Sequence, residues 1–144
     1  MKWIIYFSCL LTTIQGLAQD SQDSKRMIFP QETPVSFDLL PDSNWQRFTP
    51  SLAEIDSADR YLMTWLSRET PADRNPPALN LYYRQYVGIL RNGKRYVYIN
   101  AACRKPDYFT KNTLYPRGGG NCYFRALIDL KTNEVITLLF NAPR

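Results

Sequence analysis

The chain has 144 residues, a formal net charge of +5 and no histidine. This length suits one domain, since compact domains hold roughly 100–200 residues, and a hydrophobic content of 44% is enough for a core. The lack of histidine excludes Ser-His-Asp and Cys-His catalysis, His-ligated zinc and haem held by a proximal histidine. Carboxylates are then the only conventional general acids and bases.

The first 18 residues have the layout of a secretory signal peptide. Lys2 supplies the positive charge, Trp3–Ile14 a mostly apolar stretch, and Gly16-Leu17-Ala18 a small-residue cleavage site. The apolar stretch is shorter than the roughly 20 residues that span a bilayer. We therefore expect a secreted or periplasmic protein with no stable membrane span after cleavage.

Residues 19–48 read as an extended lead-in to a single domain at 49–144. Pro30, Pro34 and Pro41 interrupt the lead-in. Apolar residues alternate at Val35, Phe37 and Leu39, which favours a short edge strand there.

One amphipathic helix of about five turns is expected after the lead-in. Thr49 could cap it with Pro50 in the first turn, or Ser51 and Glu54 could form a capping box. Apolar residues then recur at helical spacing from Leu52 to Leu66, and Pro71 stops the helix.

Two β-hairpins follow. Asn92-Gly93 joins two Tyr-, Val- and Ile-rich segments, and Asn-Gly is the strongest short hairpin signal. If Arg91 opposes Lys94, opposed residue numbers sum to 185, and the Gln85–Asn100 pair shares a face with Val87–Tyr98. A second hairpin is expected from residues 121–130 and 134–141. No glycine fixes its turn, so the sequence does not determine its register.

The sequence thus predicts an α+β fold, with one amphipathic helix packed on a four-stranded antiparallel sheet of two hairpins. The order of elements resembles the cystatin-like arrangement.

Cys103 and Cys122 remain once Cys9 is removed with the signal peptide. Two cysteines without histidine do not make a zinc site, so no metal is expected. Their spacing is far from Cys-x-x-Cys, and an even pair in an oxidising compartment predicts a structural disulfide.

Two motifs could carry chemistry, and each has a structural alternative. Glu54, Asp56 and Asp59 crowd one helix, which would serve hydrolysis if one pKa were raised; a solvated helix face is the alternative. Residues 118–120 are glycines that could form an anion-binding nest, or simply let the chain turn beside the disulfide.

Tyrosine and arginine concentrate in the second half of the chain, where the net charge is +8 for residues 81–144 against −4 for residues 19–80. Both residue types anchor binding sites, although strand propensity also explains tyrosine. The candidate binding residues are Arg84, Tyr96, Tyr98, Arg104, Tyr108, Tyr115 and Arg117. Export and the lack of a basic run argue against nucleic acid.

Several short motifs carry a resemblance. Residues 84–88 (RQYVG), 98–103 (YINAAC), 119–124 (GGNCYF) and the final Asn141-Ala142 resemble a family of small exported bacterial proteins of unknown function. Its members often have an acid before the paired glycines, where this chain has Gly118. The resemblance implies the order of elements and the cysteine pair, and no mechanism.

The functional hypothesis is an exported, non-enzymatic and cofactor-free module that binds an envelope protein or anionic surface through the Tyr/Arg-rich hairpin and loop. Two alternatives stay open: a carboxylate-dependent hydrolase acting on cell-wall or glycan substrates, and a structural accessory subunit of an envelope complex.

Overall fold

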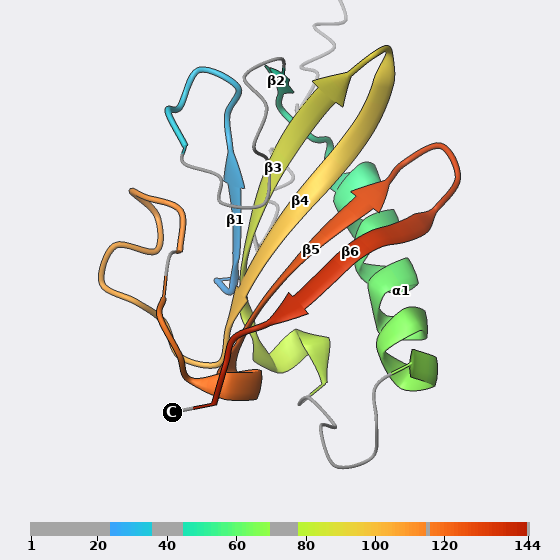
Figure 1. Cartoon of the computed structure of the whole chain (residues 1–144). Helices are drawn as coiled ribbons and strands as arrows, with labels where there is room; N and C mark the ends of the chain where they lie inside the picture. The colour runs from blue at the N-terminus through green and yellow to red at the C-terminus, as the bar shows by residue number, and fades with distance from the viewer. Residues whose placement is uncertain (1–23, 36–44, 70–77, 115, 144) are drawn as a thin grey trace, which may run out of the picture.

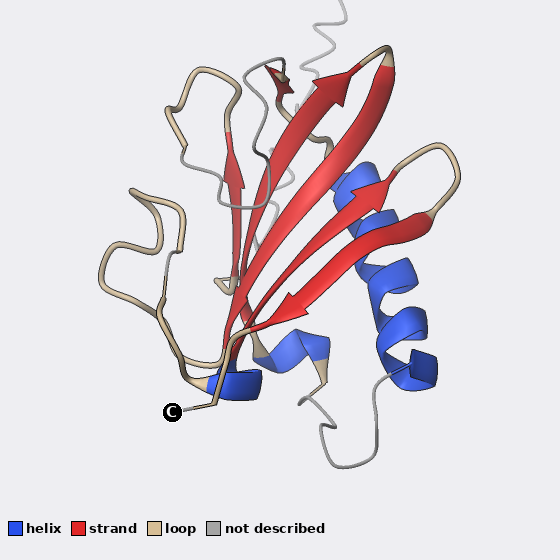
Figure 2. Ribbon diagram, in the orientation of Figure 1, coloured by secondary structure: helices blue, strands red, loops and turns tan. Residues whose placement is uncertain are grey.

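The computed structural model describes residues 24–35, 45–69, 78–114 and 116–143. They form one α-helix, two short 3₁₀ helices and a six-stranded sheet. Figures 1 and 2 show how these elements are arranged. The main elements are β1 (Arg26–Phe29), β2 (Gln46–Phe48), α1 (Leu52–Glu69), β3 (Tyr83–Arg91), β4 (Lys94–Ala102), β5 (Tyr123–Asp129) and β6 (Glu134–Phe140). The 3₁₀ helices span Leu79–Leu81 and Gly120–Cys122. The predicted signal peptide lies outside the described residues.

The α+β class is confirmed, but the prediction of four strands was wrong. The sheet order is β1-β3-β4-β5-β6, and β2 also pairs with β3. Strands β1 and β2 come from the lead-in and occupy the edge of β3 that β4 leaves open, β1 in parallel and β2 antiparallel. The edge strand expected around Val35 is not seen at Val35 itself, and Phe37 and Leu39 lie outside the described residues.

Helix α1 begins with the capping box. The Ser51 backbone N–H donates to Glu54 Oε2 at 2.9 Å, and the Glu54 N–H donates to Ser51 Oγ at 3.3 Å. The other candidate cap, Thr49, instead accepts a hydrogen bond from the Gln31 N–H through its hydroxyl oxygen. The helix ends at Glu69, just before the proline that was expected to stop it.

The first hairpin has the predicted register. Asn92 and Gly93 both have positive φ, 50° and 74°, as a type I′ turn requires. All nine opposed pairs, from Arg91–Lys94 to Tyr83–Ala102, sum to 185. The second hairpin is also present, with Asn133 at φ 60° in its turn. It starts two residues later than expected because Gly120–Cys122 forms a 3₁₀ turn.

The two faces of the sheet have separate cores. Helix α1 packs Ile55, Ala58 and Leu62 on the face that carries Tyr82 and Tyr86. The opposite face, the second face of the sheet, carries a smaller buried cluster of Phe29, Val87, Ile89, Tyr98 and Leu127. This division matches the faces predicted from the first hairpin and leaves the second face for the loop between the cysteines. Within the described ranges, no helix is long and apolar enough to cross a membrane.

Candidate functional site

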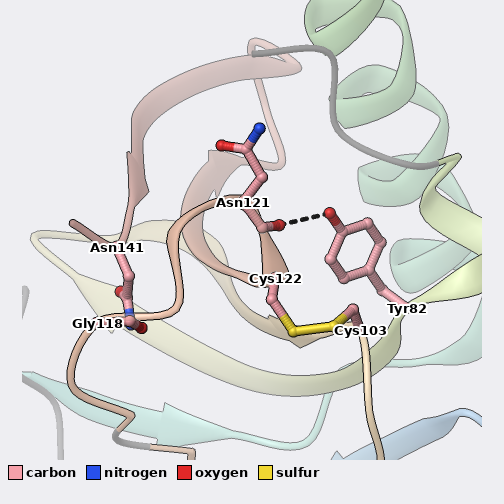
Figure 3. The surroundings of a disulfide bond; sticks show 6 residues. All are labelled: Tyr82, Cys103, Gly118, Asn121, Cys122 and Asn141. Atoms are coloured by element: carbon pink, nitrogen blue, oxygen red, sulfur yellow. Dashed lines mark hydrogen bonds between the residues drawn. A yellow bond between two sulfur atoms is a disulfide. The ribbon is translucent and has the colours of Figure 1, made fainter. Parts of the chain in front are cut away.

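A disulfide closes the base of the loop between β4 and β5. Cys103 and Cys122 are bonded, as Figure 3 shows. The Cys103 N–H also donates to the Cys122 carbonyl at 2.8 Å. On the helix side, the Tyr82 hydroxyl donates to the Asn121 carbonyl at 2.6 Å. Burial raises the pKa of Tyr82 to about 12, so it remains a donor at neutral pH. The predicted disulfide is confirmed, and it fixes both ends of the loop on the sheet.

The glycine run forms the turn that leads into β5. Gly118, Gly119 and Gly120 have φ values of 72°, 91° and 53°, a conformation that other residues rarely adopt. A Cβ on Gly119 would lie 2.7 Å from the Tyr123 ring. The Gly120 N–H donates to the Ala142 carbonyl at 3.0 Å instead of pointing to a ligand. This geometry favours the structural interpretation of the run over an anion-binding nest.

The buried amide of Gln85 holds the middle of the loop. Its Nε2 donates to the Phe109 and Asn112 carbonyls at 2.6 and 2.7 Å. Its Oε1 accepts from the Leu114 N–H at 2.7 Å. Gln85 is fully buried on the second face of the sheet. One side chain therefore satisfies three backbone groups of a segment that has no helix or strand of its own.

Asn100, opposite Gln85 on β4, completes this attachment. Its Nδ2 donates to the Leu114 carbonyl at 3.1 Å, and its Oδ1 accepts from the Tyr98 hydroxyl at 3.2 Å. Phe109 and Leu114 are buried beneath the loop. The loop thus packs on the sheet through its own apolar residues and through hydrogen bonds to two buried amides.

The polar side of the same loop faces solvent. Tyr108 is 41% exposed. The exposed charged residues in the described part of the loop are four basic and one acidic: Arg104, Lys105, Lys111, Arg117 and Asp107. Of the predicted loop residues, Arg104, Tyr108 and Arg117 are therefore accessible, whereas Tyr115 lies outside the described residues.

The predicted strand residues lie elsewhere. Arg84 and Tyr98 are buried, 3% and 1% exposed, so neither belongs to an accessible surface. Tyr96 is half-buried and packs edge-to-face on Trp45, with ring centroids 6.1 Å apart. The reason is the alternation of β4: Tyr96 and Tyr98 point to the second face, which Trp45 and the smaller core cover.

The three candidate carboxylates of α1, Glu54, Asp56 and Asp59, all pair with arginines. Glu54 pairs with Arg95 at 2.7 Å, and Asp56 pairs with Arg26 at 2.7 Å. The expectation of a solvated acidic face was wrong for Asp59, which is 5% exposed.

Asp59 lies within a cluster of donors. Its carboxylate accepts from Arg84 at 2.6 Å, from Arg26 at 2.9 Å and from the Tyr86 hydroxyl at 2.8 Å. Burial raises the pKa of Asp59 against the opposing effect of these donors. Burial and the adjacent carboxylate raise the pKa of Tyr86 far above its usual range, which keeps it a donor. These hydrogen bonds connect α1 to β1 and β3. The Asp59 carboxylate is thus occupied by side chains of the protein itself.

Sequence reasoning did not identify Gln85 and Asn100 as loop anchors. The available signal was their predicted pairing inside an otherwise apolar sheet face, since buried amides need hydrogen-bond partners. In the part of the chain that the structure describes, no group of three or more Cys, Asp or Glu side chains is placed to hold a metal ion.

Comparison with known proteins adds no assignment: no protein-family model, curated protein or solved structure matches the chain. The resemblance to small exported bacterial proteins therefore rests on the motif residues and stays a prediction.

Proposed function

We propose that the protein is an exported, non-enzymatic binding module that recognises an acidic surface of an envelope protein through its inter-cysteine loop. The observation that carries the proposal is the two-sided character of this loop. Gln85 and Phe109 hold its inner side on the sheet, while Tyr108 and the basic residues face outward. A loop ordered before binding loses less conformational entropy when a partner docks.

The chemistry of the outer side indicates the class of partner. Arg104, Lys105, Lys111 and Arg117 create a positive field, which Asp107 offsets only in part. Such a field steers acidic surfaces and raises association rates. Tyrosine adds contact area at low entropic cost, which makes Tyr108 the expected anchor.

The disulfide is compatible with an oxidising, extracytoplasmic compartment, as the proposal requires. The hydrolase alternative receives less support, because Glu54, Asp56 and Asp59 are all committed to arginine partners.

Capture from an envelope extract at two salt concentrations tests the proposal. Retention should weaken as salt rises, since the screening length falls from about 10 Å at 0.1 M to about 3 Å at 1 M. Tyr108→Ala should reduce retention about tenfold or more at low salt without a change in melting temperature. Tyr61→Ala, which removes a half-exposed tyrosine from α1, is the matched control and should bind normally.

Equal retention by the wild type and Tyr108→Ala would remove the loop from the binding surface. Retention that does not change with salt would remove the electrostatic part of the proposal.

A further inference from the structure

The outer edge of β6 is a surface that the proposed loop function does not use. β6 is the last strand of the sheet (Figure 1), and within the described ranges no strand pairs with its outer side. The Asn141 N–H donates to the Tyr123 carbonyl at 3.0 Å, so these two residues form a hydrogen-bonded pair of the β5–β6 ladder. Pairs alternate in an antiparallel ladder. The backbone groups of Phe140 and Leu138 therefore point away from β5.

This edge has little of the protection that sheet edges normally carry. Lysine, proline and inward charges commonly block edge pairing, but Glu134 is the only charged residue of β6, which has no proline. Leu139 is 43% exposed on the face opposite α1. The edge does have a bulge, because the register with β5 shifts between Leu127 and Ile128 and leaves Ile136 as the extra residue. Regular pairing is thus available only from Thr137 onward.

We propose that this edge pairs antiparallel with the same edge of a second copy of the chain, with the two-fold axis at Leu139. Leu138 of one copy then lies opposite Phe140 of the other. Both residues point their N–H and C=O groups outward, so the two symmetry-related pairs form four backbone hydrogen bonds. The two sheets become one continuous sheet across the dimer.

Three features favour this register. The Leu139 side chains face each other as a non-hydrogen-bonded pair, in which Cβ atoms lie about 4.5–5.5 Å apart, so both exposed leucines become buried. A two-fold axis at Leu138 would require the bulged Ile136 to pair with Phe140. The proposed register also keeps the two Glu134 carboxylates far apart, on the order of 30 Å at about 3.3 Å per residue.

A second copy fits this edge because the paired segment is complementary to itself. An isologous two-fold interface needs one patch that matches its own rotated image, and it is the commonest form of assembly. Leu138 and Phe140 flank Leu139 with apolar side chains, and the paired segment opposes no like charges. Five paired residues bury less area than a standard interface of about 1,200–2,000 Å². We therefore expect a reversible dimer whose population depends on concentration.

Cysteine crosslinking of the purified, unreduced protein tests the arrangement. Under mild oxidation Leu139→Cys should form a covalent dimer, because the substituted positions face each other across the axis. Ile136→Cys is the matched control: position 136 is 49% exposed on the same strand, but its two copies would lie about 20 Å apart. Efficient dimer formation by Leu139→Cys alone supports the proposal, and equal crosslinking of the two variants overturns it.

Sedimentation velocity over a hundredfold concentration range provides the independent measurement. The wild type should shift from monomer toward dimer, and Leu139→Lys should remain monomeric, because it places two like charges opposite each other. Since Arg125 lies opposite Leu139 on β5, the lysine should also lower the melting temperature. Leu139→Glu, which places an opposite charge beside Arg125, should be monomeric with a melting temperature close to that of the wild type. A dimer that persists in Leu139→Lys would mean that another surface associates. A wild-type monomer at every concentration, with no Leu139→Cys crosslink, would overturn the proposal and leave the edge for a strand from another protein.

Discussion

Replacing Gln85 by leucine should release the inter-cysteine loop while leaving the sheet intact. Leucine is one bond shorter than glutamine but has a similar volume and suits the apolar second face, so the substitution removes the amide without opening a large cavity. What is lost is the set of hydrogen bonds to the loop backbone: two donated by Nε2 and one accepted by Oε1.

The expected loss in the free energy of unfolding is about 2–4 kcal/mol. Each of the three hydrogen bonds contributes about 0.5–1.5 kcal/mol net, which sums to about 2–4 kcal/mol if loop release lets the freed backbone groups bond to water. Asn112 is exposed, so its carbonyl can turn to water. The Phe109 carbonyl and the Leu114 N–H lie beneath the loop and cannot reach water unless the loop moves. A domain with a stability of about 5–15 kcal/mol stays folded after such a loss.

Urea unfolding of the unreduced protein, together with hydrogen exchange at the Leu114 amide, measures both effects. Gln85→Leu should lower the unfolding midpoint and speed exchange at this amide, while amides in the middle of β4 keep their protection. Gln46→Leu, at an exposed position of β2, should change stability by less than about 0.5 kcal/mol. A loss below about 1 kcal/mol with wild-type exchange at Leu114 would refute the role of Gln85 as the loop anchor.

Three further predictions concern the frame around the loop. Cys103→Ser should lower the free energy of unfolding by about 3 kcal/mol, the chain-entropy value for a loop of about 20 residues, and mass spectrometry that finds two free thiols in unreduced wild-type protein would contradict this. Gly93→Val should destabilise the domain in thermal unfolding by about 1 kcal/mol or more, since φ is 74° there; an unchanged melting temperature would argue against the turn. Because burial raises the pKa of Tyr82 to about 12, its contribution to stability is complete below the unfolded value near 10 and is lost as the pH rises toward 12, by about 1.4 kcal/mol per pH unit. Urea titrations at alkaline pH should show this slope, and it should become shallower in Tyr82→Phe.

The parts of the fold that the sequence predicted are those with local signals. Asn92-Gly93 determines the turn and therefore the register of β3 on β4. Ser51 and Glu54, which are three residues apart, form the capping box that starts α1. These signals act over a few residues, so they do not depend on how the rest of the chain is arranged.

The parts that the sequence did not predict depend on distant partners. β1 has four residues and pairs in parallel with a strand more than fifty positions later, and no local pattern specifies such a contact. Asp59 was placed among solvated acids because its partners, Arg26 and Arg84, come from two other elements. Arg84 was assigned to a binding surface because its partner, Asp59, likewise comes from another element. The spacing of charged residues along a helix or strand does not predict whether an oppositely charged residue from another element pairs with them.

The exposure of the candidate binding residues was predicted in part. The basic character of the loop follows from composition, and Arg104, Tyr108 and Arg117 are exposed as a binding role requires. The separation of Tyr108 from its neighbour Phe109, one exposed and one buried, depends on the anchoring of the loop by Gln85. Two adjacent aromatic residues in an irregular segment do not predict which ring faces the sheet.

Site-specific photocrosslinking in living cells tests the central claim most directly. A photoreactive phenylalanine analogue at position 108 places the probe where Tyr108 is exposed, and the same analogue at position 61 on α1 is the control. A discrete adduct with one envelope protein at position 108, absent at position 61, is the predicted result. No adduct at position 108, or the same adducts at both positions, would contradict the assignment of the inter-cysteine loop as the binding surface.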